Sequence, residues 1–332
     1  MIGACGIVKL IIQIPCFNEE ATLPVTVVDL PKQIEGIDTV EYLIINDGST
    51  DMTIEAAHKA GIHHIVDLKV NRGLAVAFVT GIDACLRLGA DIIVNTDADN
   101  QYCGADIVSL IEPIVLGKAE IVIGERPIDK TEHFSPIKKI MQRFGSYVVR
   151  VASGTKIPDA PSGFRAYTRD AALRINVINT YTYTLETIIQ AGHNRIPITS
   201  VPIKTNPVLR KSRLFKSMTS YMKRSAIVII RSFIAYKPLR FFFILGGTVT
   251  IIGVSFIIRW LVLSSLGLSS GNIQSLILAA MLVMIGVQLF IAGLQADVTA
   301  ASRKILEDVQ YRIRKMEINA THEANKNKSN DY

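Results

Sequence analysis

Up to residue 206 the chain alternates short apolar runs with amphipathic stretches. The apolar runs have the length of buried strands, and the amphipathic stretches repeat apolar residues at helical spacing. Strands are predicted at residues 10–15, 42–45, 92–94, 120–123 and 195–203. Helices are predicted at residues 50–59, 74–88 and 183–191. Strands that alternate with helices predict an α/β domain with a mostly parallel sheet, covered by helices on both faces.

The hydropathy pattern changes after Pro207. Residues 213–237 form a basic amphipathic pattern, which favours a helix lying in a lipid headgroup layer over an ordinary surface helix. Residues 241–258 and 273–294 are two nearly unbroken apolar runs, each close to the roughly 20 residues that cross a bilayer. Lys and Arg flank this pair and the loop between them is uncharged, so the positive-inside rule places both flanks in the cytoplasm.

A last amphipathic helix is predicted at residues 298–316, followed by a polar tail at 319–332 that is expected to be disordered. We expect the apolar face of this helix to pack on the cytoplasmic domain or on a second subunit. That face consists of Val298, Ile305, Leu306, Val309, Ile313 and Met316. The predicted parts are a cytoplasmic domain (1–207), interfacial helices (208–238), a membrane hairpin (239–296) and a cytoplasmic helix with its tail (297–332).

Charge and cysteine content indicate where in the cell the protein works. The chain has 332 residues, a mean hydropathy of +0.32 and a formal net charge of +7. Lys and Arg cluster at 209–240 and 303–315, where interleaved aliphatic and aromatic residues favour a membrane surface over nucleic acid. The cysteines lack the spacing of a zinc site or a disulfide framework, which favours reduced thiols on the cytoplasmic side. They are Cys5, Cys16, Cys85 and Cys103.

The sequence N-T-D-A-D-N-Q at residues 95–101 follows a predicted buried strand. Side chains two residues apart in an extended segment point the same way, so Asp97 and Asp99 can converge on one cation and Gln101 can add a neutral oxygen. Such oxygen ligands suit Mg²⁺ or Mn²⁺. The alternative is a strand end followed by an acidic, helix-capping turn. Because parallel strands present their carboxyl ends at one edge, residues 18–19 and 46–47 are expected in the same crevice.

Five motifs together resemble inverting family 2 glycosyltransferases with the GT-A fold, in particular the polyprenyl-phosphate branch. The motifs are P-C-F-N-E-E at 15–20, I-N-D-G-S-T-D at 45–51, N-R-G-L at 71–74, D-A-D at 97–99 and S-G-F-R at 162–165. Asn46 departs from the family pattern, which has Asp there. The two apolar runs extend the resemblance to bacterial undecaprenyl-phosphate glucosyltransferases, relatives of dolichol-phosphate mannose synthase.

The resemblance implies a Rossmann-like GT-A catalytic domain joined to a helical transmembrane hairpin, and it assigns roles to residues. Asp97, Asp99 and Gln101 would hold Mg²⁺ or Mn²⁺ against the donor diphosphate. The nucleotide sugar would be bound by Pro15, Phe17, Glu19, Asn46, Asp47, Arg72 and Asp97. Asp159 matches a family carboxylate near the sugar and is assigned to sugar binding or acceptor orientation.

The acceptor implied by the resemblance is a lipid monophosphate, which is largely dianionic at neutral pH and needs positive charge rather than a protein base. Arg126 and Arg143, assisted by Ser146, are the candidates to hold it, with Lys138 and Lys139 as alternatives. Phe215 and Met218 are expected near the lipid chain. Arg165 is equally compatible with a structural pairing to a carboxylate.

The reaction predicted is transfer of glucose from UDP-glucose to undecaprenyl phosphate at the cytoplasmic face of the inner membrane, by a homo-oligomer (dimer or tetramer) with both termini in the cytoplasm. The same reaction with GDP-mannose or UDP-N-acetylglucosamine is an alternative. A processive polysaccharide synthase is disfavoured because the Q-x-x-R-W motif is absent. A non-catalytic membrane scaffold is disfavoured by the intact metal motif, and no nucleic-acid partner is expected.

Overall fold

The computed structural model describes residues 7–127, 136–177, 183–207, 227, 238–267 and 273–330. Two compact units are present. The first comprises Met1–Ile229 together with Val309–Tyr332, and the second comprises Ile230–Asp308. The chain therefore leaves the first unit and returns to it through the end of its last helix.

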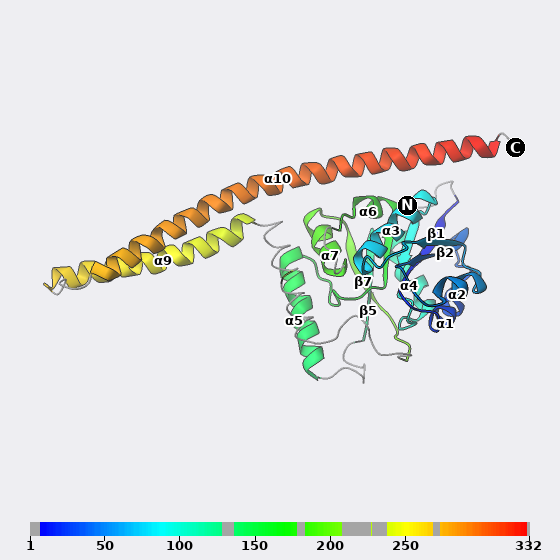
Figure 1. Cartoon of the computed structure of the whole chain (residues 1–332), viewed down its shortest axis with the longest axis horizontal. Helices are drawn as coiled ribbons and strands as arrows, with labels where there is room; N and C mark the ends of the chain where they lie inside the picture. The colour runs from blue at the N-terminus through cyan, green and yellow to red at the C-terminus, as the bar shows by residue number, and fades with distance from the viewer. Residues whose placement is uncertain are drawn as a thin grey trace. The chain divides into compact units, whose positions relative to one another are not determined.

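The first unit contains a seven-stranded sheet and the helices that cover it (Figure 1). Its strands are β1 (Lys9–Cys16), β2 (Thr39–Asn46), β3 (His64–Asp67), β4 (Ile92–Asn95), β5 (Ile121–Glu125), β6 (Arg165–Thr168) and β7 (Ile198–Pro202). Its helices are α1 (Leu23–Asp29), α2 (Thr53–Lys59), α3 (Leu74–Arg87), the 3₁₀ turn η1 (Gly104–Asp106), α4 (Ile107–Val115), α5 (Pro136–Ser153), α6 (Arg169–Arg174) and α7 (Thr184–His193).

The strands lie in the order β3-β2-β1-β4-β6-β5-β7. β1 to β4 are mutually parallel and β5 is parallel to β7, whereas β6 is antiparallel to both of its neighbours. The predicted α/β class with a mostly parallel sheet of GT-A type is therefore confirmed. Parallel pairing brings the carboxyl ends of β1, β2, β3 and β4 to one edge, where ligands bind in sheets of this kind.

Alternate residues of the central strands are buried on opposite faces of the sheet. On one face Leu10, Ile12 and Ile14 join a core with apolar residues of α1, α2 and α4. On the other face α3 packs so closely that a Cβ at Gly81 would overlap the side chains of Gln13 and Ile45. Burial on both faces explains why these strands are continuous apolar runs, as expected for parallel sheets covered by helices.

Four elements of the first unit were not predicted: β3, η1, α4 and α6. β3 is a four-residue edge strand whose residues are all only partly buried, so its apolar signal is weak. α4 contains Pro113, which a sequence pattern counts against a helix, but Pro113 lies in a helix of only nine residues. The expected helix ends are confirmed, because Gly61 and Gly89 follow α2 and α3 with φ of 72° and 85°.

The second unit is built from α9 (Pro238–Ser265) and the first part of α10 (Ile273–Asn330). Both helices are long and apolar enough to cross a membrane, with mean hydropathies of 2.4 and 2.5 over their most apolar windows. Small residues bring them together, since a Cβ at Gly253 would meet the carbonyl oxygen of Ala279 and one at Gly246 would meet that of Gly286. Their other apolar side chains are largely exposed, as a lipid-facing hairpin requires.

Two predicted segments, 213–237 and 319–332, are not confirmed by the structure. The basic amphipathic segment at 213–237, with Phe215 and Met218, lies outside the described residues. The expected disorder of 319–332 is wrong up to Asn330, because α10 continues to that residue. The segment lacks Gly and Pro and contains Ala, Glu and Lys, so its polarity does not prevent it from extending an existing helix.

Candidate active site

Asp97 and Asp99 follow the carboxyl end of β4 at the centre of the sheet. The backbone does not stay extended there, as the sequence argument assumed: it turns at Ala98–Asp99, and Asn100 adopts a positive φ of 54°. The backbone N–H of Gln101 donates to Oδ1 of Asp99 across this turn, at 3.2 Å. The two carboxylates nevertheless interact: the negative charge of Asp99 raises the pKa of Asp97.

This pair of carboxylates fits a divalent cation. Burial, and then the charge of the neighbouring Asp99, raise the pKa of Asp97 to about 7, and a bound cation would offset both effects. The buried Oδ1 of Asn100 has no hydrogen-bond partner among the described residues. Oxygens of this kind are ligands for Mg²⁺ or Mn²⁺. The described residues contain no cluster of three or more His, Cys, Asp or Glu side chains, so an ion here would also need neutral or substrate ligands.

The segment after β1 lies beside this pair. Glu19 is 7% exposed, it accepts a hydrogen bond from the hydroxyl of Thr22 at 2.6 Å, and its charge also raises the pKa of Asp97. Phe17 is 40% exposed, whereas Pro15 is buried within β1 and pairs with Ile45. Of these residues, Phe17 therefore offers a ring face to a ligand, and Pro15 contributes to the sheet.

The polar side chains at the end of β2 and just after it form hydrogen bonds with neighbouring loops. The carboxylate of Asp47 accepts hydrogen bonds from the backbone N–H groups of Arg72 (2.7 Å) and Gly73 (2.9 Å). Asn46 donates to Asp67 at the end of β3 and accepts from the backbone of Ser49. The side chain of Arg72 is exposed above this turn. Asp47 and Asn46 thus shape the loop that carries Arg72.

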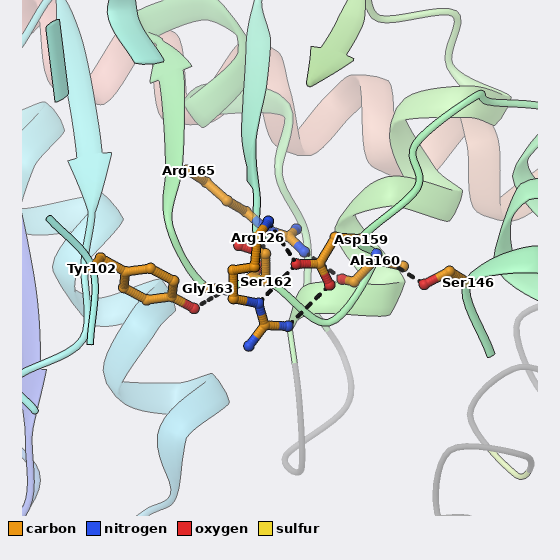
Figure 2. A network of polar contacts seen from close by, with 8 residues as sticks. All are labelled: Tyr102, Arg126, Ser146, Asp159, Ala160, Ser162, Gly163 and Arg165. Carbon is orange, nitrogen blue, oxygen red and sulfur yellow. Dashed lines mark hydrogen bonds and ion pairs between the residues drawn. The ribbon is translucent and has the colours of Figure 1, made fainter. Parts of the chain in front are cut away.

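Arg126 and Asp159 form a buried ion pair beside the acidic pair (Figure 2). Arg126 Nε lies 2.7 Å from Oδ2 of Asp159, and Nη2 lies 2.9 Å from Oδ1, so the pair is bidentate. Asp159 is fully buried, while the side chain of Arg126 is 16% exposed. The charge of Arg126 lowers the pKa of Asp97, which places the guanidinium near the acidic pair. The remaining nitrogen, Nη1, points away from Asp159.

The other acceptor candidates lie in α5, and Arg165 is the first residue of β6. The hydroxyl of Ser146, 1% exposed, accepts a hydrogen bond from the backbone N–H of Ala160 and so supports the loop that carries Asp159. Arg165 is fully buried and donates to the carbonyl oxygens of Ala160 and Ser162 and to the hydroxyl of Thr187, which gives it a structural role among the described residues. Helix α5 contains Arg143, Lys138 and Lys139. The side chains of all three lie outside the described part of the chain.

Tyr102 and Asn95 contribute to the site and were missed by the sequence argument. The hydroxyl of Tyr102 accepts the backbone N–H of Gly163, and burial followed by the charge of Asp97 raises the pKa of Tyr102. Asn95 accepts from Gln13 and donates to the carbonyl oxygen of Gly163 and to Tyr183. These bonds join the S-G-F-R loop to β1 and β4. The polar residue at the end of an otherwise apolar strand was the available signal for Asn95.

The arrangement is therefore an acidic pair with one arginine beside it, at the carboxyl edge of a parallel sheet. The loops around it are fixed by buried hydrogen bonds, and Nη1 of Arg126 lies outside the bidentate pair with Asp159. Such a set can hold a cation together with a phosphate-containing molecule.

Comparisons with known proteins agree with this chemistry. The model of "Glycosyl transferase family 2" matches residues 11–175. A Methanococcus voltae UDP-N-acetylglucosamine–dolichyl-phosphate N-acetylglucosaminyltransferase is 31% identical over 214 residues, which cover 58% of this chain and 83% of that protein. An undecaprenyl-phosphate 4-deoxy-4-formamido-L-arabinose transferase of Salmonella choleraesuis is 25% identical over 334 residues, covering 94% of this chain and 96% of the relative.

Among solved structures, glucosyl-3-phosphoglycerate synthase from Mycobacterium tuberculosis in complex with Mn²⁺, UDP and glucosyl-3-phosphoglycerate matches with a TM-score of 0.53. The match covers 69% of this chain and 80% of that one, at 17% identity. It supports the fold described above.

Proposed function

Because this chain belongs to glycosyl transferase family 2, we propose that it is a membrane-bound inverting glycosyltransferase acting on a polyprenyl phosphate. The observation that carries the proposal is the acidic pair Asp97 and Asp99 with Arg126 beside it, at the carboxyl edge of the sheet. Relatives named for transfer to dolichyl phosphate and to undecaprenyl phosphate support this acceptor class.

On the donor side, Asp97 and Asp99, with Gln101 or Asn100 as a neutral ligand, would hold Mg²⁺ or Mn²⁺. A divalent ion there neutralises the charge that develops on the leaving diphosphate. Phe17 would lie against the nucleotide base, and Glu19 would bind the ribose or base edge. Asp47 acts on the donor through the loop it holds, because its two oxygens accept backbone N–H groups from Arg72 and Gly73.

On the acceptor side, Arg126 would bind the lipid phosphate through Nη1. Its bidentate pairing with Asp159 fixes the plane of the guanidinium, so little side-chain freedom is lost when the phosphate binds. Arg143 on α5 is the second proposed contact. Ser146 acts indirectly in this scheme, since its hydroxyl supports the loop that carries Asp159.

In the reaction, an oxygen of the acceptor phosphate attacks the anomeric carbon from the side opposite the nucleotide diphosphate. The bond between that carbon and the diphosphate oxygen breaks, and the nucleoside diphosphate leaves with the electron pair. A phosphate monoester has a second pKa of about 6, so no proton has to be removed from it near neutral pH. We assign Asp159 to positioning and not to proton transfer, because it is fully buried and engaged by Arg126.

We propose UDP-glucose as the donor and undecaprenyl phosphate as the acceptor. A relative named for UDP-N-acetylglucosamine and a structural neighbour with bound UDP support a uridine nucleotide. UDP-N-acetylglucosamine and GDP-mannose are the competing donors, since Asn46 stands where the family has an Asp.

The location proposed is the inner membrane, with α9 and the first part of α10 as the spanning pair and the catalytic domain in the cytoplasm. The two helices have the required length and apolar character. The Lys and Arg residues that flank them support a cytoplasmic position for both ends of the hairpin. Phe215 and Met218 are proposed to contact the lipid chain.

Transfer of label tests the activity. The purified full-length protein is incubated with Mg²⁺ or Mn²⁺, undecaprenyl phosphate and one labelled donor at a time: UDP-glucose, UDP-N-acetylglucosamine or GDP-mannose. We expect labelled lipid with one donor, and a loss of about 10²-fold or more in Asp99→Ala because an ion ligand is removed. Glu112→Gln, an exposed carboxylate of α4, is the matched control and should keep full activity. No labelled lipid with any donor, or equal rates for Asp99→Ala and wild type, would refute the proposal.

A further inference from the structure

The last part of α10 packs on the catalytic unit through one polar face. The hydroxyl of Tyr311 donates to Asp170 of α6 at 2.6 Å, and Nη1 of Arg314 donates to the carbonyl oxygen of Ile175 at 3.1 Å. Ile318 is 1% exposed. These positions recur every three to four residues and so lie on one side of the helix. The catalytic unit therefore covers this side of α10.

The opposite side of the same stretch is apolar and exposed. Val309 is 44% exposed, Ile313 45% and Met316 64%, and Ala320 is also exposed. We call these four residues the α10 seam. Their spacing of four, three and four residues is the heptad spacing of a two-stranded coiled coil, and Leu306 extends it by one position toward the N-terminus. Val309, Ile313 and Met316 form the C-terminal part of the apolar face predicted for residues 298–316, and their side chains are exposed in the described structure.

We propose that the α10 seam pairs with the α10 seam of a second copy of this chain in a parallel coiled coil. Val309 and Met316 then occupy d positions of the heptad, and Ile313 and Ala320 occupy a positions. Tyr311 and Ile318 fall at f, the position farthest from the partner, which agrees with their packing on the catalytic unit. Each helix can thus bind its own domain and its partner at the same time.

The charges beside the seam favour a second copy of this chain as the partner, in parallel orientation. Arg312 occupies g and Glu317 occupies the following e. Both side chains are exposed, and each also interacts within its own chain, Glu317 with the charge of Arg87 in α3. In a parallel pair, g of one helix meets the following e of its partner, so Arg312 faces Glu317 of the partner subunit on both sides of the seam. In an antiparallel pair, g meets g and e meets e, which would oppose like charges. The charges are therefore self-complementary in the parallel arrangement.

Only two heptads are present, which is short for an isolated coiled coil. The helix is continuous with an apolar segment able to cross a membrane, and two copies in one membrane are oriented alike and concentrated. The charged residues that separate this apolar segment from the seam, among them Asp297 and Arg303, make the lipid layer itself an unsuitable partner for the seam.

Cysteine cross-linking in the full-length protein, reconstituted in phospholipid vesicles, tests the contact. Met316→Cys places a thiol at a d position, where two parallel chains bring identical residues within disulfide distance. Lys315→Cys is the matched control: it is adjacent, exposed and outside the seam. With wild type as background for the native thiols, we expect at least about tenfold more covalent dimer for Met316→Cys than for Lys315→Cys. Equal cross-linking of the two variants would overturn the proposal.

Charge reversal tests the orientation on the same Met316→Cys background. Arg312→Glu and Glu317→Arg should each lower the dimer yield, because each opposes like charges across the seam. The double variant, Arg312→Glu with Glu317→Arg, should restore the yield. Failure of the double variant to recover would overturn the parallel pairing. Circular dichroism and donor binding verify that each variant is folded, since none of the three residues belongs to the proposed active site.

Discussion

Asp47 shows how a single carboxylate can hold a loop at the edge of the candidate site. It accepts two backbone N–H groups from the turn at 72–73, so replacing it by Asn leaves one oxygen to accept and turns an amide N–H₂ group toward a donor. We expect Asp47→Asn to lower the free energy of unfolding by about 1–3 kcal/mol and to weaken UDP binding. Chemical denaturation and calorimetric titration with UDP measure the two effects. Glu55→Gln, an exposed carboxylate of α2, should change neither, and an unchanged stability of Asp47→Asn would contradict this role.

The pair of Arg126 and Asp159 provides a second test at this scale. Asp159→Ala leaves a largely buried guanidinium without its partner, and we expect it to cost about 3 kcal/mol of unfolding free energy. The acceptor KM should rise, because Arg126 then loses its fixed orientation. The double variant with Arg126→Ala should cost less than the sum of the single variants.

A matched control for that pair lies three residues after Asp159 in the same loop. The hydroxyl of Ser162 is buried and has no hydrogen-bond partner among the described residues, so Ser162→Ala should be neutral or slightly stabilising. Denaturation curves and lipid-transfer assays compare the variants. Additive losses in the double variant, or an acceptor KM unaffected by Asp159→Ala, would show that Asp159 does not position Arg126.

The sequence predicted which residues would gather at this edge better than it predicted what their atoms do. Glu19, Asp97 and Asp99 follow the parallel strands β1 and β4, so parallel pairing brings them together. Arg126 follows β5, which reaches the same edge because the antiparallel β6 lies between β4 and β5. Asn46, Asp47, Ser146 and Arg165 bind backbone groups of loops, and these partners depend on loop conformations that no residue pattern specifies. The site roles assigned to individual residues therefore stay predictions.

At the scale of elements, the turn after β2 controls the shape of the nucleotide side. Gly48 has a φ of 68°, and a Cβ there would lie 2.5 Å from the backbone nitrogen of Asn71. We expect Gly48→Ala to destabilise the protein by about 3 kcal/mol, from the positive φ and from the displaced backbone. It should also weaken UDP binding, since the displaced turn carries the N–H groups that Asp47 binds. Thermal unfolding and UDP titration give the two values.

Gly36 supplies the control for the backbone contribution. Its φ is 80°, but no heavy atom lies within 4 Å of an added Cβ. Gly36→Ala should therefore cost about 1–2 kcal/mol from backbone conformation alone and leave UDP binding unchanged. Equal effects of the two variants would show that the contact between the two turns has no influence on the site.

Secondary-structure elements were predicted where the hydrophobic pattern along the chain was strong. The central strands were found because burial on both faces makes them unbroken apolar runs, as in residues 10–14. β3 was missed because an edge strand buries less, and the antiparallel direction of β6 was not predicted because strand order depends on contacts distant in sequence. The helix at 298–316 was predicted, but the sequence did not determine which of its faces packs on the catalytic unit. The structure shows that Tyr311 and Arg314, on its polar face, make this contact.

For the whole molecule, the decisive feature is that the catalytic unit contains residues from both sides of the apolar hairpin. Arg314 joins them: its side chain is 15% exposed, it donates to the carbonyl oxygens of Leu173 and Ile175 at the end of α6, and it lies 3.6 Å from Asp83 of α3. Arg314→Ala removes the partner of these carbonyl groups. We expect a loss of about 1–2 kcal/mol in unfolding free energy.

Hydrogen exchange locates that loss. In the full-length protein, Arg314→Ala should accelerate amide exchange in α6 and in residues 309–320 of α10 more than in the central strands, because stability is lost where the two segments meet. Lys304→Ala, an exposed position earlier in α10, should leave exchange unchanged. Unchanged exchange of α6 in Arg314→Ala would mean that the returning helix does not stabilise the catalytic unit. If the acceleration is observed, the end of α10 is part of the fold of the catalytic unit, and a catalytic domain cut before α9 would lack a stabilising element.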